Sequence, residues 1–357
     1  MALGTVIGVK MDTPEPCDIT YYAFGGGMGH VTRAAAILRH VPRLSHLRPV
    51  VVTNAVYPLP LVTEGIAYVH LGETEPAALA AKLRATLDAL RPTLLVMDVF
   101  PHGVVGEMAD VIPSLSCARA LVCRRLRPQY SRRLAAEVAG FDLALCVEPP
   151  APRLPIPVVD CSPVLLRDPG ELPSRLEARA LLGVAPDERA VLAVSTEDAH
   201  DTSRLFALIA RLAADLRPPP RLFWASPSLE PVSRTEAYCR GERLEHYPLL
   251  EVLSGADVLV GASGYNLFTE VNAVGVPTVF VPRERRYDDQ QRRAKDAMVA
   301  SDPGRLAALL EALVAAEPRS PERPAFANRA SQAAAELVRL TQAWAAAGTR
   351  RVLGFRS

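Results

Sequence analysis

The chain has 357 residues, which is long enough for two domains that each bury a core. Hydrophobic residues make up 49% and aromatic residues 6%, so alanine, valine and leucine should dominate that core. The formal net charge of +1 gives no overall field that would attract nucleic acid, and we expect no nucleic-acid partner. The six cysteines form no CxxC pair and have no zinc-ligand spacing, which indicates reduced thiols and no bound metal.

The amino terminus has no basic segment followed by an apolar one, and no apolar run reaches the length of a membrane span. We therefore expect a cytoplasmic protein, with peripheral contact at the inner face of the membrane left open. Arginine greatly outnumbers lysine among the basic residues. Of the 40, only Lys10, Lys82 and Lys295 are lysines and the other 37 are arginines, which indicates codon bias more than phosphate recognition.

Short apolar runs alternate with helical patterns after residues 1–17, which look like a poorly ordered leader. Such alternation is typical of a parallel sheet with helices on both faces. The expected strands are Ile19–Phe24, Pro49–Thr53, Ile66–Leu71, Leu94–Asp98 and Phe141–Val147, and the expected helices lie near Val31–His40 and over Ala77–Leu90.

Eight prolines between Pro149 and Pro173 mark a domain linker, because proline fixes φ and removes a backbone donor. A second alternation of strands and helices follows it. The expected strands are Ala190–Ser195, Arg221–Ala225, Val258–Val260 and Thr278–Val281, and the expected helices are Ser203–Leu216, Leu249–Leu253, Leu267–Val274, 304–316 and 322–346, the last ended by Gly348.

The sequence therefore predicts an α/β protein with two Rossmann-like, doubly wound domains that face each other across a cleft. Residues 1–160 form the first domain and residues 161–330 the second. The last segment, 331–357, is expected to be a helix that packs back on the first domain.

The segment FGGGMGHVTR, residues 24–33, leads from a predicted strand into a predicted helix. A glycine-rich turn of this kind lets backbone N–H groups and a helix N-terminus approach an anion. It is not a dinucleotide fingerprint, because His30 stands at the third glycine position of GxGxxG and the next strand ends at Asn54 instead of an acid. The alternative, close packing of helix and strand, needs fewer than three consecutive glycines.

His30 opens the predicted helix, where the positive helix end favours a neutral imidazole that can act as a base. The alternative is a histidine that caps the helix at the surface. Asp98 stands at the carboxyl end of its strand, where ligands of open α/β sheets bind. If the two strands are neighbours, Asp98 can hold the Nδ1–H of His30 and stabilise the imidazolium; otherwise it caps the next element.

The segment from Val260 to Ala294 repeats the phosphate-binding pattern of strand, small-residue turn and helix. Glu270 lies inside the predicted helix, where a carboxylate can accept from two ribose hydroxyls. A polar loop then supplies Asp289, Gln290 and Gln291, which offer the donors and acceptors that a pyranose ring requires.

This segment resembles the donor-binding segment of the glycosyltransferase-B superfamily, and in particular the branch of UDP-sugar transferases that contains MurG. The loop of residues 24–33 is similar to the glycine-rich loop of that branch, which also ends in Gly-His-Val. The resemblance implies that Gly26, Gly27, Gly29 and Arg33 face an acceptor, that His30 is the general base and that Asp98 is its partner. It also implies a donor site made of Ser195, Tyr247, Ser263, Gly264, Glu270, Asp289, Gln290 and Gln291.

One feature departs from the MurG pattern. The second glycine-rich loop of that branch corresponds here to residues 194–198, Val-Ser-Thr-Glu-Asp, which contain no glycine. In addition, Gly-x-Gly-His-x-x-Arg, from Gly27 to Arg33, is also similar to a MurG-like hydrolase of UDP-linked deoxysugars.

The resemblance implies an inverting transfer from a nucleotide sugar to the hydroxyl of a lipid-linked, glycan or small-molecule acceptor. Uridine is the implied base, with deoxythymidine still open. No DxD motif is present and the adjacent Asp288 and Asp289 should point apart, so we expect neither a metal nor any other cofactor. Two alternatives remain, a nucleotide-sugar hydrolase in which His30 activates water and a non-catalytic protein that binds nucleotide sugars.

Overall fold

The computed structural model describes residues 9–25, 27–56, 58–72, 75–194, 199–225, 241–317 and 324–352. The chain divides into two compact units. Unit 1 comprises Met1–Leu166 and Asn328–Ser357, and unit 2 comprises Arg167–Ala327, whereas the sequence analysis placed the boundaries after residues 160 and 330. Within the described part of the chain, we find no helix with the length and apolar character that a bilayer crossing needs.

Unit 1 is built on a seven-stranded parallel sheet in the order β3-β2-β1-β4-β5-β6-β7. The strands are β1 (Ile19–Ala23), β2 (Pro49–Thr53), β3 (Ala67–His70), β4 (Leu94–Asp98), β5 (Ala118–Cys123), β6 (Leu143–Cys146) and β7 (Val158–Asp160). The helices are α1 (Met28–Leu38), α2 (Val41–Leu44), α3 (Leu59–Thr63), α4 (Pro76–Leu90), α5 (Pro128–Glu137) and α11 (Ala330–Val352).

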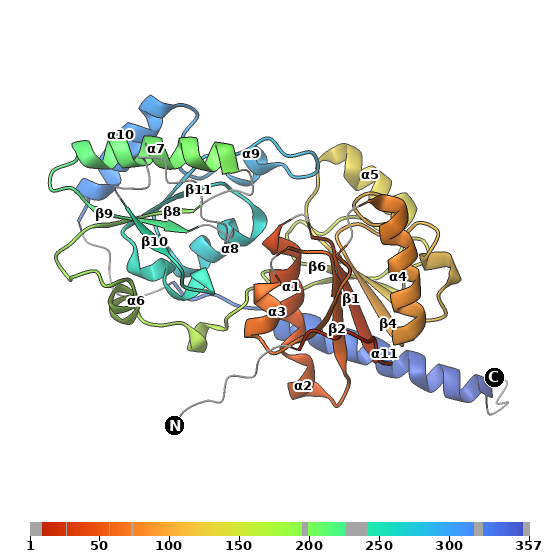
Figure 1. Ribbon diagram of the computed structural model, residues 1–357. Helices are drawn as coiled ribbons and strands as arrows, with labels where there is room; N and C mark the ends of the chain where they lie inside the picture. Colours follow the sequence, from red (N-terminus) through yellow and green to blue (C-terminus); the bar gives the residue numbers. More distant parts are fainter. Residues whose placement is uncertain are drawn as a thin grey trace, which may run out of the picture. The chain divides into compact units, whose positions relative to one another are not determined.

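The helices of unit 1 cover both faces of its sheet, with α1 and α3 on one face and α4 and α5 on the other (Figure 1). The terminal helix α11 packs against α1 and α2 and so belongs to unit 1. Strands β1, β2 and β4 are buried almost throughout, in keeping with their largely apolar sequences. The strand order reverses between β1 and β4, and such a switch point opens a crevice at the carboxyl ends of the strands.

Unit 2 has a five-stranded parallel sheet in the order β10-β9-β8-β11-β12. The strands are β8 (Ala190–Val194), β9 (Arg221–Ala225), β10 (Glu242–Leu244), β11 (Val258–Gly261) and β12 (Thr278–Phe280), and the α-helices are α6 (Arg175–Leu182), α7 (Ala199–Asp215), α8 (Tyr265–Val274), α9 (Gln290–Arg293) and α10 (Pro303–Ala315). Helices α7 and α10 pack on one face, with Phe206 stacked on Trp224 in the core at 4.5 Å between ring centroids (Figure 1). The switch point of this sheet lies between β8 and β11.

Four expectations need correction. The leader expected over residues 1–17 includes an edge pairing, since Lys10 bridges to Tyr68 of β3. The proline-rich linker contains β7, an edge strand paired with β6 that fits between Pro157 and Pro163. Gly348 lies inside α11 instead of ending it, and β5 was missed because Arg119 interrupts its apolar run.

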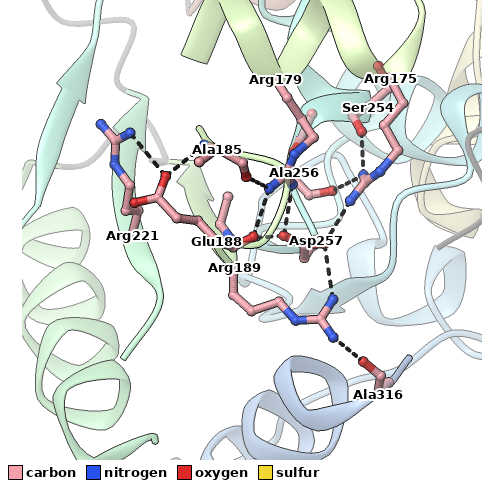
Figure 2. Close-up of polar contacts among 12 residues, drawn as sticks. Arg175, Arg179, Ala185, Glu188, Arg189, Arg221, Ser254, Ala256, Asp257 and Ala316 are labelled. Carbon is pink, nitrogen blue, oxygen red and sulfur yellow. Dashed lines mark hydrogen bonds and ion pairs between the residues drawn. The ribbon is translucent and has the colours of Figure 1, made fainter. Parts of the chain in front are cut away.

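A buried ion cluster closes the amino ends of the unit 2 sheet (Figure 2). Asp257, directly before β11, accepts from Arg175, Arg179 and Arg189 at 2.7, 3.2 and 3.4 Å. It also accepts from the backbone N–H of Ala190 at 2.8 Å, which fixes β8 beside β11. The arginines donate further to backbone carbonyls of Ala185, Glu188, Ser254, Gly255, Ala256 and Ala316.

Replacing Asp257 with Asn should destabilise unit 2, because three guanidinium groups would lose the carboxylate that neutralises them. The expected loss is about 3–5 kcal/mol of unfolding free energy, the usual cost of breaking a buried ion pair on one side. Urea unfolding followed by fluorescence of the buried Trp224, in a Trp344→Phe background, reports on unit 2 alone. The exposed Asp187 provides the control Asp187→Asn, and equal midpoints for the two variants would contradict the assignment.

Candidate functional site

The switch point of unit 1 brings together the two residues that the sequence analysis placed in the catalytic site. His30 lies in the first turn of α1, which directly follows β1, and Asp98 is the last residue of the neighbouring β4. Asp98 Oδ2 lies within hydrogen-bond distance of His30 Nδ1. The side chain of His30 is 17% exposed while that of Asp98 is fully buried, so the ring links a buried carboxylate to the surface.

Asp98 is the centre of a wider polar cluster. Arg33, one turn after His30 on α1, donates from Nε to Oδ1 at 2.8 Å and from Nη2 to Oδ2 at 2.6 Å. The Tyr21 hydroxyl of β1 donates to Oδ1 at 2.7 Å. Both carboxylate oxygens thus accept hydrogen bonds, and contacts from α1 and β1 fix the position of the carboxylate.

The charges around Asp98 determine the protonation of the cluster. Burial by itself would raise the pKa of Asp98, but the Arg33 guanidinium and His30 outweigh it and hold that pKa well below its usual range. Burial and the Asp98 charge raise the pKa of Tyr21, which therefore stays a donor. Because an ionised carboxylate only accepts, His30 must donate from Nδ1, and in the neutral ring the lone pair lies on Nε2.

The glycine loop before α1 has structural reasons for two of its glycines. A Cβ on Gly25 would lie 2.5 Å from the Ala55 backbone, so close packing of the loop on the end of β2 requires glycine. Gly27 has φ 137°, which side chains rarely adopt. Gly29 lies within α1, and Gly26 lies outside the described residues.

Arg33 was expected to face an acceptor, but its side chain is buried inside unit 1. It is 4% exposed and donates to Asp98, so its charge stabilises the carboxylate inside unit 1. Sequence reasoning missed Tyr21 altogether. The available signal was a tyrosine in the central, fully buried β1, since a buried phenol usually needs a hydrogen-bond partner.

The corresponding turn of unit 2 lies between β11 and α8, beside the switch point. Gly264 is the N-cap of α8 and offers no side chain, so the positive helix end is left to its backbone N–H groups. Ser263 is fully buried, and its hydroxyl donates to the Gln290 carbonyl oxygen at 2.9 Å. The hydroxyl therefore ties the turn to the following loop.

In the loop of Asp289, Gln290 and Gln291, two side chains make hydrogen bonds to the protein backbone that the sequence did not predict. Asp289 caps α9 by accepting from the backbone N–H of Arg292 at 3.1 Å. Gln290 is buried, and its Oε1 accepts from the backbone N–H of Arg283 at 2.9 Å. Gln291 is exposed.

Two residues outside the predicted site hold this loop against the turn. Arg293 donates to both carboxylate oxygens of Asp288, at 2.7 and 3.0 Å. The same guanidinium donates to the Ser263 carbonyl at 2.9 Å. As expected, Asp288 and Asp289 serve different partners, and the buried ion pair positions the backbone that follows β11.

Glu270 is different, because its carboxyl group has no hydrogen-bond or ion-pair partner among the described residues. It lies in α8, six residues after the N-cap, and is partly buried. Burial raises its pKa to about 7. A partly buried carboxyl group without a protein partner can accept hydrogen bonds from the donor groups of a ligand.

The remaining predicted donor residues are Tyr247 and Ser195. Tyr247 is partly buried and precedes the short 3-10 segment Leu249–Glu251. Ser195 lies outside the described residues. In the described ranges, no group of three His, Cys, Asp or Glu side chains is arranged to hold a metal ion.

Comparison with solved structures identifies the fold. The chain is similar to the glycosyltransferase of kitacinnamycin (17% identity, TM-score 0.57, 93% of this chain and 96% of that chain). It is also similar to the glycosyltransferase VinC in complex with dTDP (17% identity, TM-score 0.55, 92% of this chain and 96% of that chain). A third similar structure is MurG of Acinetobacter baumannii (16% identity, TM-score 0.55, 92% of this chain and 95% of that chain). No protein-family model and no curated protein sequence matches the chain. Its two α/β units therefore have the GT-B glycosyltransferase fold, and the similar scores do not single out the MurG branch.

Replacing Glu270 with Gln should change how the stability of unit 2 depends on pH. Because folding raises the pKa of this carboxyl group from 4.5 to about 7, ionisation costs the folded state more than the unfolded one. The wild type should thus lose stability relative to Glu270→Gln as pH rises from about 4.5 to about 7, with a constant difference on the order of 3 kcal/mol above that range. Urea unfolding of both proteins at several pH values measures the difference, and a difference independent of pH would contradict the assignment.

Proposed function

We propose that this protein is an inverting glycosyltransferase that moves a sugar from a nucleoside-diphosphate sugar to an acceptor hydroxyl. The observation that carries the proposal is the pairing of His30 with the buried Asp98 at the switch point of unit 1. A base oriented by a second group is what activation of a weak nucleophile requires. The GT-B fold of the two units supports the same reading.

In the proposed reaction His30 Nε2 removes the proton of the acceptor hydroxyl. The hydroxyl oxygen attacks C1 of the sugar as the bond from C1 to the diphosphate oxygen breaks, and the diphosphate leaves with the electron pair. Attack from the face opposite the leaving group inverts C1. The Asp98 carboxylate stabilises the imidazolium that forms, and Arg33 keeps that carboxylate ionised.

Unit 2 is the proposed donor site. The uncapped N-terminus of α8, after Gly264, would meet the negative charge that develops on the leaving diphosphate, without a metal ion. Glu270 would accept from ribose hydroxyls, and the loop of Asp289, Gln290 and Gln291 would face the sugar. Tyr247 and Ser195 complete the proposed contacts to the base and the phosphates.

The proposed donor carries uridine or deoxythymidine, and a MurG-like UDP-sugar enzyme is the finer form of the proposal. Support for deoxythymidine comes from the similar VinC, whose structure contains dTDP. A thermal-shift panel of UDP, dTDP, ADP and GDP with their sugars tests the class of ligand. Absence of stabilisation by every compound would overturn the proposal.

A nucleotide-sugar hydrolase is the competing activity, because a partly exposed His30 can accept a proton from water as well as from an acceptor. The two differ when the donor is incubated without an acceptor. The transferase should release sugar only slowly, and stoichiometric release at the full rate would favour the hydrolase. Binding of nucleotide sugar with no turnover in either case would indicate a non-catalytic binding protein.

Replacing His30 with Ala should lower kcat by about 10²–10⁴-fold, the usual contribution of a positioned base. The affinity for the nucleoside diphosphate should stay unchanged, because the proposed nucleotide contacts all belong to unit 2. Initial rates and calorimetric titration measure the two quantities. The exposed His46 gives the control His46→Ala, which should behave as wild type, and a matching loss of nucleotide affinity in His30→Ala would contradict the assigned role.

Replacing Gly264 with Ala tests the proposed contact between the diphosphate and the α8 backbone. The new Cβ would find its nearest protein atom, Gln290 Nε2, at 3.9 Å, and φ of −63° suits alanine, so the fold should persist. A diphosphate against this backbone would be displaced, and we expect affinity for UDP or dTDP to fall by about 10–100-fold, or ~1.4–2.8 kcal/mol.

The control for this variant is Gly170→Ala, whose Cβ would meet nothing within 4 Å and which lies far along the chain from α8. It should bind nucleotide as the wild type does. Equal affinities of the two variants, with both folded by circular dichroism, would show that no phosphate approaches Gly264.

A further inference from the structure

A cavity of about 350 Å³ in unit 1 lies apart from the His30 cluster. Its volume falls within the range of pockets that bind small organic ligands, about 300–1,000 Å³. Three segments form its walls, namely the segment of residues 10–14, the end of β3 and the exposed side of α4. The lining residues are Lys10, Met11, Asp12, Pro14, Val69, His70, Leu71, Lys82, Ala85 and Thr86.

The segment before β1 closes one side of the cavity. Met11 donates its backbone N–H to Tyr68 at 2.8 Å, and Tyr68 donates to Val9 at 3.2 Å, so the segment extends the sheet beyond β3. The chain then crosses to α4, where Cys17 donates to the Leu90 carbonyl at 2.9 Å. The wall is therefore anchored at both ends by backbone hydrogen bonds.

The cavity gathers two of the three lysines of the chain, although arginines outnumber lysines by 37 to 3. Lys82 donates from Nζ to the Leu71 carbonyl at 3.0 Å, which leaves two further N–H donors on that ammonium group. Lys10 faces Asp12 at 3.6 Å, but the Asp12 side chain is 88% exposed, and such a solvated pair is weak. The Lys10 side chain is 55% exposed, so its compact point charge lies at the open side of the cavity, where it suits a single anionic group.

Apart from the two lysines, the lining combines five apolar residues with Asp12, His70 and Thr86. Val69 and Leu71 are buried at the end of β3, and Pro14 and Ala85 belong to the other two walls. His70 turns its Nε2 toward the Ala55 carbonyl, to which it donates at 2.9 Å. The cavity thus offers apolar side chains beside two ammonium groups.

We infer that this cavity binds a small amphiphilic anion, a carboxylate or phosphate group on a short apolar body, with the anionic group at Lys10 and Lys82. The site belongs wholly to unit 1 and does not depend on the proposed glycosyl transfer. Octanoate and octyl phosphate represent the two forms of the anionic group. Acetate and inorganic phosphate test charge alone, and octanol tests the apolar body alone.

The scarcity of lysine makes the test specific. Reductive methylation of the full chain with ¹³C-formaldehyde labels the three lysines and the terminal amine, and Lys10→Arg and Lys82→Arg assign the signals. Octanoate or octyl phosphate should shift the Lys10 and Lys82 signals saturably with one shared Kd. Lys295, 69% exposed and 3.6 Å from Asp296, is the internal control and should not move.

The affinity for octanoate or octyl phosphate should exceed that for acetate, inorganic phosphate and octanol by about tenfold or more. In calorimetric titrations of unmodified protein, the double variant Lys10→Gln/Lys82→Gln should lose about tenfold in affinity, whereas Lys295→Gln should lose none. Circular dichroism verifies that each variant is folded. Signals that do not saturate, equal shifts at Lys295, or equal affinity for the short anions would overturn the inference.

Discussion

The burial of the Asp98 carboxylate is the constraint on which the site in unit 1 depends. A buried anion is tolerated only when it is paired and hydrogen-bonded, and Arg33 and Tyr21 supply this. The helix that carries Arg33 is therefore held against β4, and His30, one turn earlier on α1, is brought to the same carboxylate. One electrostatic requirement thus positions the proposed base and fixes which ring nitrogen carries its proton.

In unit 2, a buried ion pair holds the backbone ahead of α8 in place. The buried pair of Asp288 and Arg293 anchors the loop after β12 to the Ser263 carbonyl, so the chain that enters α8 is held in place from outside the helix. Gly264, the N-cap of α8, supplies no side-chain cap, and the Glu270 carboxyl group has no partner among the described residues. A preorganised backbone of this kind does not have to reorganise when charge appears in front of it.

The sequence predicted the buried strands best. Pro49–Thr53, Leu94–Asp98 and Arg221–Ala225 have the expected bounds, because strands covered on both faces have largely apolar sequences. The edge strand β7 and the interrupted β5 lacked that signal. The pairing of His30 with Asp98 was predictable once His30 was placed at the start of the helix after β1 and Asp98 at the carboxyl end of the neighbouring β4. The inward turn of Arg33 and the capping role of Asp289 depend on side-chain directions that only tertiary packing decides.

Within the part of the chain that the structure describes, the polar groups fall into two kinds, those that contact one another and those without a protein partner. At the amino ends in unit 2, the groups around Asp257 form a dense set of mutual contacts, and this part of the sheet stabilises the fold (Figure 2). His30 Nε2, beside the carboxyl ends of the unit 1 strands, and the Glu270 carboxyl group, inside α8, have no partners among the described residues. Unsatisfied polar groups cost stability, which supports the proposal that ligands satisfy these two groups. Function on a widely used fold is carried by such groups, and the fold alone does not specify it.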